Sequence, residues 1–339
     1  MKPLKTVLAI SILLFAVSFL IPSLLVLPFS SERAGAQLGE EAGSPEVRHD
    51  KAQPAAEVAV FRTATNKVEK IQLEEYVEGV VASEMPAEFE EEALKAQALT
   101  ARTYIVNHLL HSKDDHVPHD ADVSDTVNHQ VFKNKQELQL LWGKDYDWKM
   151  KKIKEAVEAT KGEILTYNGK PINASFFSTS NGYTENAEEY WSSPVPYLKS
   201  VESPWDAHSP KFQDRKVFGI KEFQQKLNIN LENSNDIGTI TKRTSGKKVA
   251  KVSIAGKTFT GREIREKLGL QSTDFSWERK GDTIIVSTKG YGHGVGMSQY
   301  GANGMAKEGK NYEDIVRHYY QGISISSVRQ YDKIMASSQ

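Results

Sequence analysis

Glu84 is the residue of this sequence whose surroundings best suit acid chemistry. It closes a segment with helical apolar periodicity, Leu73 to Met85, and Pro86 follows. A proline disfavours helical backbone at the residue before it, so the helix should end at about Glu84. The negative end of the helix dipole and the apolar neighbours would both raise the pKa of this carboxyl. A carboxylic acid that stays protonated near neutral pH can cleave a glycosidic bond, although a surface glutamate at a frayed helix end would have the same spacing.

A glycine-rich segment from Gly290 to Gly296, with His293 inside it, is the second candidate. It lacks the glycine spacing and the following acidic residue of a dinucleotide fingerprint. Its glycines would let backbone N–H groups approach a ligand closely, and His293 could donate to a sugar or acyl oxygen. A tight turn around a packed histidine fits the same pattern.

The run Ser178 to Thr184 is the third candidate. Short hydroxyls and amides suit carbohydrate binding, but they also suit a turn whose side chains bond to its own backbone.

Four histidines with aspartates among them could ligate zinc, yet they lack a tight ligand motif, and a solvated loop is the simpler interpretation. We therefore expect no metal and no cofactor. No Gly-x-Ser-x-Gly elbow is present, which weakens a serine-hydrolase hypothesis. The four histidines of the possible zinc site are His111, His116, His119 and His129.

The elements that must position these residues are helices and strands in irregular order, which predicts an α+β fold. A hairpin with its turn at Asn168-Gly169 is expected over 162–177. The expected helices are 73–84, a second from about Glu88, 148–161, 218–228, 260–270, one from about Ser298, and 312–319. The expected strands outside the hairpin are 58–61, 248–259 and 283–287.

Length and composition exclude several classes of protein. The chain has 339 residues, 43 Lys+Arg against 44 Asp+Glu, and no cysteine. The near-zero net charge gives no support to a dedicated nucleic-acid binder. The absence of cysteine excludes disulfides, thiolate zinc sites and a cysteine nucleophile. The composition is that of a globular protein with one large domain or two ordinary ones.

The N-terminus predicts a membrane anchor. An uncharged run from Thr6 to Phe29 follows Lys2 and Lys5, and as a helix it would reach about 36 Å, enough to span a bilayer. The flanking lysines should keep that end cytoplasmic and place the remainder outside. A signal peptide cleaved near Ala34-Gly35-Ala36 is the alternative. The expected organisation is an anchor at 1–29, a flexible stalk at 30–56, one catalytic domain at 57–330 and a C-terminal tail at 331–339.

Three motifs in order give the sequence a resemblance to a known family. The first is Val80 to Pro86, followed by Glu92 to Ala98 and Ala101 to Tyr104. The second is Phe177 to Thr184, and the third is Gly292 to Gln299. Together they resemble the stage II sporulation protein D family, over about Glu57 to Tyr320. The resemblance implies a membrane-bound lytic transglycosylase of peptidoglycan that acts during forespore engulfment, on the mother-cell side facing the forespore septum. It also implies two partners, the amidase stage II sporulation protein P and the membrane protein stage II sporulation protein M.

The resemblance assigns the catalytic glutamate of the family to Glu84. The expected reaction cuts the bond between N-acetylmuramic acid and N-acetylglucosamine in peptide-free strands. Glu84 would act first as acid and then as base, because the muramyl 6-hydroxyl supplies the nucleophile and leaves a 1,6-anhydro end. Clostridial relatives carry a zinc site that uses cysteines, which this chain lacks. The residues expected to bind substrate are Ser178, Thr179, Asn181, Thr184, His293, Gln299 and Arg102.

Two other functions remain open at this stage. The chain could be a wall-bound activator of the partner amidase with no chemistry of its own, because the family also contains amidase enhancers. It could also be a metal hydrolase built on His111 to His129, which would lose activity on chelation. The segment from Asp206 to Lys280 carries no interpretable motif.

Overall fold

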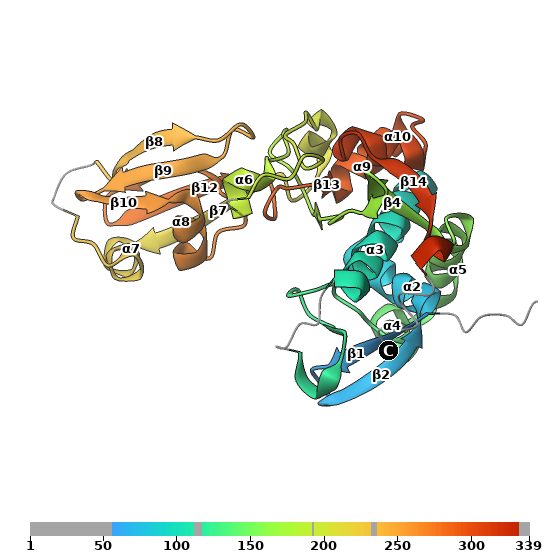
Figure 1. The fold of residues 1–339 in the computed structure, drawn as a ribbon. Coiled ribbons are helices and arrows are strands. Elements are labelled where there is room, and N and C mark those ends of the chain that lie inside the picture. Colours follow the sequence, from blue (N-terminus) through green and yellow to red (C-terminus); the bar gives the residue numbers. More distant parts are fainter. Residues whose placement is uncertain (1–55, 112–116, 192, 232–235, 332–339) are drawn as a thin grey trace, which may run out of the picture. The chain divides into compact units, whose positions relative to one another are not determined.

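The computed structural model describes residues 56–111, 117–191, 193–231 and 236–331, and these fold as the predicted α+β mixture (Figure 1). The α-helices are α2 (Leu73–Glu84), α3 (Glu91–His111), α4 (Lys135–Trp142), α5 (Tyr146–Ala159), α6 (Ala187–Trp191), α7 (Ile220–Leu227), α8 (Gly261–Leu268), α9 (Gln299–Lys307) and α10 (Tyr312–Tyr319). Short 3₁₀ turns are η1 (Pro118–Asp120), η2 (Gly143–Asp145), η3 (Pro204–His208) and η4 (Val328–Tyr331).

The strands form small sheets that are mostly antiparallel. Their orders are β2-β1-β3, β14-β4-β5, β11-β12-β7 and β10-β9-β8, with a parallel pair β13-β6. The strands of the first two sheets and of the pair are β1 (Glu57–Arg62), β2 (Lys67–Gln72), β3 (Val123–Ser124), β4 (Glu163–Tyr167), β5 (Lys170–Pro171), β14 (Ser324–Ser327), β6 (Phe176–Phe177) and β13 (Met297–Ser298). The strands of the other two sheets are β7 (Gln213–Gly219), β8 (Thr239–Arg243), β9 (Val249–Ile254), β10 (Lys257–Thr260), β11 (Asp274–Lys280) and β12 (Thr283–Lys289).

Helix α3 is the centre of the larger hydrophobic core. It contacts α2, α5, α9 and α10 and the strand β4. The small alanine side chains of α3 allow these contacts, because they let several helices pack closely against it. Four of them are completely buried: Ala93, Ala96, Ala98 and Ala101.

A second hydrophobic core lies mostly in the segment that carried no interpretable motif, and strand β12 completes it. It is built by β7 to β12 together with α7 and α8, and Phe223, Ile264 and Val252 are fully buried within it. The helix α8 begins with a capping box, in which Thr260 and Glu263 exchange side-chain to backbone hydrogen bonds. Both helices end at a residue in left-handed conformation, Asn228 after α7 and Gly269 after α8.

Most of the expected elements are present, with some boundaries corrected. Helix α10 covers the predicted residues, and α2 ends at Glu84 as Pro86 requires. The 162–177 hairpin is confirmed only to Pro171, with Asn168 and Gly169 both at positive φ in its turn. Phe176 and Phe177 instead pair with β13.

Three expectations are corrected. The segment expected as one strand, 248–259, is the hairpin β9-β10, because Ala255 and Gly256 turn the chain at positive φ. Phe218 and Gly219 complete strand β7 instead of opening a helix, and α3 begins at Glu91 rather than near Glu88. Helix α4 was not expected. No helix in the described part of the chain has the length and apolar character needed to cross a bilayer, and the expected anchor at 6–29 lies outside the described residues.

Candidate functional site

Glu84 lies at the point where the first and third motifs meet. Helix α2 ends there because Met85, before Pro86, is extended at φ −126° and ψ 135°. The last carbonyl groups of a helix need outside donors, and Gln299 supplies one. Its side-chain Nε2 donates to the main-chain oxygen of Glu84 at 3.0 Å. The first residue of α9 is thereby fixed against the last residue of α2.

The carboxyl group of Glu84 is half-buried and held from one side. The backbone N–H of Val131 donates to its Oε1 at 2.8 Å. Burial raises the pKa of Glu84, while the Val131 hydrogen bond and the positive charge of Lys133 oppose this. The direction is the one expected from the sequence. Among the described residues, no second carboxylate contributes to this pKa shift.

The second motif is joined to the third through the main chain. Strands β6 and β13 are parallel partners, with Phe177 opposite Ser298. The backbone N–H of Tyr300 in α9 also donates to the oxygen of Ser178 at 3.1 Å. Since α9 contacts Glu84 through Gln299, all three motifs converge on one region of the fold. This convergence was not deducible from their spacing along the chain.

Most hydroxyls of the second motif are used inside the protein. Thr179 shares a hydrogen bond with Ser209 (2.9 Å), and Thr184 accepts one from the backbone N–H of Val201 (2.9 Å). Both threonines are almost completely buried, whereas Ser178 is half-buried. Ser178 is therefore the hydroxyl of this group with the best access to a ligand.

Asp206 gathers the neighbouring hydroxyls into a buried network. It accepts hydrogen bonds from the hydroxyls of Ser180 (2.8 Å), Ser203 (2.6 Å) and Ser298 (2.6 Å). Burial raises the pKa of Asp206, and these hydrogen bonds to the charged form oppose that shift. The network fixes the start of α9, because Ser298 is also the N-cap of that helix.

Asn181 connects the second motif to the segment of the second core. Its Nδ2 donates to the oxygen of Gly246 at 3.0 Å and to Oδ2 of Asp274 at 2.9 Å. Its Oδ1 accepts from the ammonium group of Lys248 at 3.3 Å. The amide is thus occupied by internal partners on both sides.

His293 is neutral, and its ring nitrogen Nε2 acts as a hydrogen-bond donor. That nitrogen lies 3.0 Å from the oxygen of Phe176, while Nδ1 accepts from the backbone N–H of Val295 at 3.1 Å. This pattern requires the tautomer with the proton on Nε2. Burial, with the positive charge of Arg265, lowers the pKa of His293 to about 4. The aromatic rings around it, at 5.4–5.7 Å, are Phe177, Tyr190 and Trp191.

Arg102 does not face a ligand. Its guanidinium is completely buried, pairs with Glu74 at 2.7 Å and donates to the oxygens of Val157 and Glu163. These contacts tie α3 to α2, α5 and β4. Arg102 is therefore a structural residue in this arrangement and is left out of the proposed site.

The pair Glu185 and Glu189 was missed by the sequence analysis. Burial raises the pKa of Glu185 to about 7, helped by a hydrogen bond with Glu189 and opposed by the charge of Lys248. Glu185 accepts hydrogen bonds from the hydroxyl of Thr244 and from the backbone N–H of Gly246 (3.1 Å). Its position directly after Thr184 was the available signal, but the partners that bury it lie some 60 residues away.

The predicted histidine loop is only partly described, since His116 lies outside the described residues. His129 binds the hydroxyl of Ser124 through Nδ1 at 2.9 Å, and His111 contacts its own helix. Within the described ranges, no three His, Asp or Glu side chains converge as a metal site would require. The residues give no reason to place a metal here.

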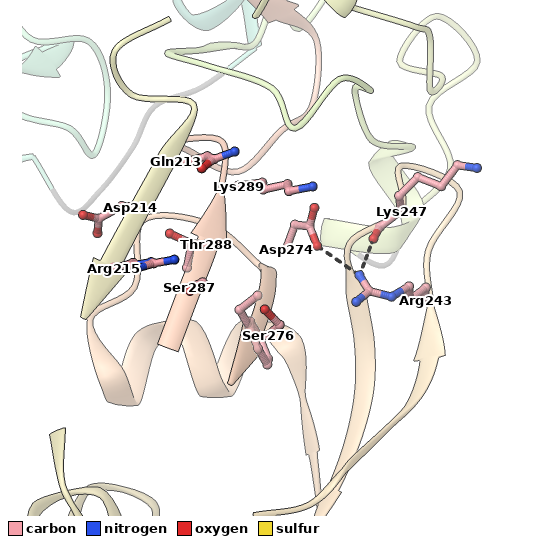
Figure 2. Close-up of a pocket in the computed structure, with 11 residues that line it drawn as sticks. Gln213, Asp214, Arg215, Arg243, Lys247, Asp274, Ser276, Ser287, Thr288 and Lys289 are labelled. Atoms are coloured by element: carbon pink, nitrogen blue, oxygen red, sulfur yellow. Dashed lines mark hydrogen bonds and ion pairs between the residues drawn. The ribbon is translucent and has the colours of Figure 1, made fainter. Parts of the chain in front are cut away.

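Two of the pockets in the described structure lie away from Glu84. One of about 390 Å³ is bordered by β7, β11 and β12 and by the turn after β8 (Figure 2). Another of about 890 Å³ is bordered by Leu73, Gly162 and Val328. Glu84 borders neither of them.

Comparison with known proteins gives the same assignment as the motifs. The family model described as Stage II sporulation protein matches residues 61–167. Stage II sporulation protein D of Bacillus subtilis is 56% identical over 321 residues, which cover 92% of this chain and 93% of that protein. The chain belongs to the stage II sporulation protein D family.

Two further relatives show the spread of this family. Stage II sporulation protein D of Bacillus amyloliquefaciens is 55% identical over 316 residues, covering 91% of this chain and 92% of that protein. The Amidase enhancer of Bacillus subtilis is 31% identical over 305 residues, covering 74% of this chain but only 40% of the enhancer. The family resemblance seen in the three motifs is thus confirmed, and a relative is named for an effect on an amidase.

Proposed function

We propose that this member of the stage II sporulation protein D family is a peptidoglycan lytic transglycosylase, with Glu84 as its acid and base. The observation that carries the proposal is the environment of this carboxyl. It is half-buried, its pKa is raised by burial, and three separate motifs converge around it. A carboxyl with a raised pKa retains its proton to a higher pH and can deliver it to a leaving oxygen.

The hydrogen bond from Val131 indicates which oxygen carries the proton. Oε1 of Glu84 already accepts from the Val131 N–H, so the acid proton belongs on Oε2. In the proposed reaction, Oε2 donates this proton to the oxygen between the two sugars as the bond to the anomeric carbon breaks. The muramyl 6-hydroxyl then attacks that carbon and returns its proton to the carboxylate, which restores the acid.

A second catalytic carboxylate is not needed for this reaction. Hydrolases need one to activate water or to form a covalent intermediate. Here the nucleophile belongs to the sugar itself and gains the high effective concentration of an intramolecular reaction.

The remaining parts of the proposal concern place and partners. We place the catalytic domain outside the cytoplasmic membrane, anchored by residues 1–29 and facing the septum from the mother cell during engulfment. Its proposed partners are the amidase stage II sporulation protein P and stage II sporulation protein M. The surrounding glycan contacts are proposed at Ser178 and in the loop of His293, with Gln299 holding Glu84 in position.

The competing function is activation of an amidase without glycan cleavage, which is favoured by the similarity to the Amidase enhancer. Incubating the protein with peptide-free glycan strands and searching for 1,6-anhydromuramyl ends by mass spectrometry separates the two. We expect such ends from the wild type and a loss of at least a hundredfold in Glu84→Gln, which keeps the shape but removes the acid.

Glu90→Gln is the matched control, because Glu90 is an exposed carboxylate near the start of α3 and its replacement changes the net charge equally. Activity of Glu90→Gln should equal that of the wild type. A wild type that stimulates the amidase yet makes no anhydro ends would overturn the enzymatic proposal. Full activity in Glu84→Gln would assign the acid to another residue.

A further inference from the structure

The 390 Å³ pocket beside β7, β11 and β12 has a regular floor of polar side chains. Directly opposite residues in an antiparallel sheet point to the same face, as do residues two positions apart. The register places Ser276, Ser287 and Arg215 in one row across the three strands. Asp274, Lys289 and Gln213 form the next row on that face.

The wall of the pocket is formed by the turn between β8 and β9. Arg243 donates there to Asp274 Oδ1 at 3.0 Å and to the oxygen of Lys247 at 2.7 Å (Figure 2). The other oxygen of Asp274 accepts from the amide of Asn181. The negative charge of Asp274 is therefore already balanced before any ligand enters.

Among the described residues, three cations of the pocket have no carboxylate partner: Arg215, Lys289 and Lys247, of which Lys247 lies over the ring of Tyr183 at 5.1 Å. Arg215 and Lys289 are both exposed, and within the described ranges neither has a carboxylate within 4 Å. The lining as a whole has four basic side chains against the carboxylates of Asp214 and Asp274. In the view of Figure 2, Arg215 and Lys289 extend from their strands toward the side where Asp274 and Arg243 stand. The pocket should therefore attract a negatively charged group.

The rest of the lining restricts what carries that charge. Phe275 is its one aromatic or aliphatic residue and is only 1% exposed, so the apolar surface of the pocket comes from the aliphatic parts of polar side chains and not from a hydrophobic side chain. It also offers no exposed aromatic ring on which a nucleobase could stack. Gln213, Ser276 and Ser287 instead supply hydroxyl and amide groups that match the hydroxyls of a sugar. The volume lies within the usual range of small-ligand pockets, about 300–1,000 Å³.

We propose that this pocket binds a carboxylate-bearing sugar of the glycan strand, with Arg215 and Lys289 on the carboxylate and the row of hydroxyl and amide groups on the ring. The inference rests on the proposed function for its ligand: a muramic acid residue exposes a free lactyl carboxylate only after its peptide has been removed. The pocket would thus select peptide-free strands at a place distinct from Glu84, which does not border it.

The test is a binding titration of the full chain carrying Glu84→Gln, so that no strand is cut during the measurement. The probes are peptide-free glycan strands and the same strands with their lactyl carboxylates converted to methyl amides. We expect the neutral strands to bind about ten- to a hundredfold more weakly, the effect of losing hydrogen bonds to a charged group. Adding Arg215→Gln and Lys289→Gln should weaken binding of the charged strands by the same factor as neutralising their carboxylates does. Binding of the neutral strands should not change.

Lys280→Gln with Lys221→Gln is the matched control, since it removes two exposed positive charges at other positions. This control should bind both probes like the parent chain. Equal affinity for the charged and neutral strands, or equal weakening by the control pair, would overturn the inference. One further result would overturn the inference. A glycerol phosphate polymer would bind with the same dependence on Arg215 and Lys289, while the strands would show no preference for the lactyl carboxylate.

The measurement is independent of cleavage. A protein that makes no anhydro ends but still discriminates between the two probes would disprove the proposed enzymatic activity and retain the pocket. A protein that cleaves strands but binds the two probes equally would support the proposed enzymatic activity and disprove the pocket.

Discussion

Glu185 and Glu84 are both carboxyls with raised pKa values, but their surroundings differ in kind. Glu84 is held by one backbone donor and lies at the junction of three motifs. Glu185 is 2% exposed and is enclosed by Thr244, Gly246 and a second carboxyl. Among the described residues, only Oε1 of Glu84 accepts a hydrogen bond, which leaves Oε2 for chemistry, whereas both oxygens of Glu185 accept one, although Glu185 also borders a pocket with His293. We therefore assign catalysis to Glu84.

The pH dependence of stability tests this view of Glu185. Its pKa is about 7 in the folded protein against 4.5 as the ordinary value, so folding favours its protonated form. The stabilisation is complete below pH 4.5 and is lost as the pH rises through about 7. Glu185→Gln is always neutral and lacks this dependence. We expect the difference in unfolding free energy between wild type and variant to change by on the order of 3 kcal/mol between pH 4.5 and pH 8, in favour of the variant at high pH.

Urea denaturation at several pH values measures this difference. Glu308→Gln, at an exposed position after α9, serves as the control and should show a difference from wild type that does not depend on pH in this manner. A constant difference for Glu185→Gln across the range would contradict the burial and proton sharing inferred here.

The sequence predicted the position of Glu84 and the direction of its pKa shift from local features, although the carboxyl is also held by Val131, 47 residues away along the chain. Pro86 ends the helix and the apolar neighbours precede the carboxyl in the same segment. Glu185 and Arg102 could not be interpreted in this way. The environment of each is supplied by residues far away along the chain, Thr244 for Glu185 and Val157 for Arg102. Spacing alone carries no information about such partners.

At the level of elements, the glycine-rich loop shows why the third motif needs its glycines. Gly296 has φ +80°, and a Cβ atom there would lie 2.0 Å from the oxygen of Ser175. That oxygen accepts hydrogen bonds from the N–H of Met297 and from the hydroxyl of Tyr320. The close approach allows β13 to pair with β6 and sets the start of α9, which carries Gln299 to Glu84.

Gly296→Ala should therefore destabilise the protein by about 2–5 kcal/mol, the sum of the left-handed backbone cost and the steric clash. Gly309→Ala is the matched control, because Gly309 has φ +84° but a Cβ atom there would meet nothing within 4 Å. It should cost only about 1–2 kcal/mol. Chemical denaturation of both variants measures the difference, and equal losses would show that the contact with Ser175 is not tight.

Element boundaries were predictable where a residue type enforces them. Pro86 after α2 and the Asn168-Gly169 turn both gave correct positions. The β9-β10 hairpin was missed because Ala255 occupies a left-handed conformation that alanine rarely adopts. Gly256 beside it, also at positive φ, is the local signal of this two-residue turn.

At the scale of the whole molecule, two hydrophobic cores are linked by polar contacts of the second motif. Asn181 bonds to Gly246 and Asp274, and Lys248 contacts Asn181 in turn. Most of the second core lies in residues for which the sequence offered no motif, because its apolar residues are spread over several strands and two helices. Its existence depends on pairing between strands, which is a long-range property.

These polar contacts should make the two cores unfold together. Asn181→Ala removes three hydrogen bonds to the second core, two of them with the charged groups of Asp274 and Lys248, and should lower the coupling between the cores by about 2–4 kcal/mol. We expect differential scanning calorimetry to show one transition for the wild type, with equal calorimetric and van't Hoff enthalpies, and two resolved transitions for the variant. Asn128→Ala, at an exposed loop position, should keep the wild-type profile. A single unchanged transition in Asn181→Ala would mean that other contacts between the two cores, such as those of Glu185 with Thr244 and Gly246, suffice to couple them.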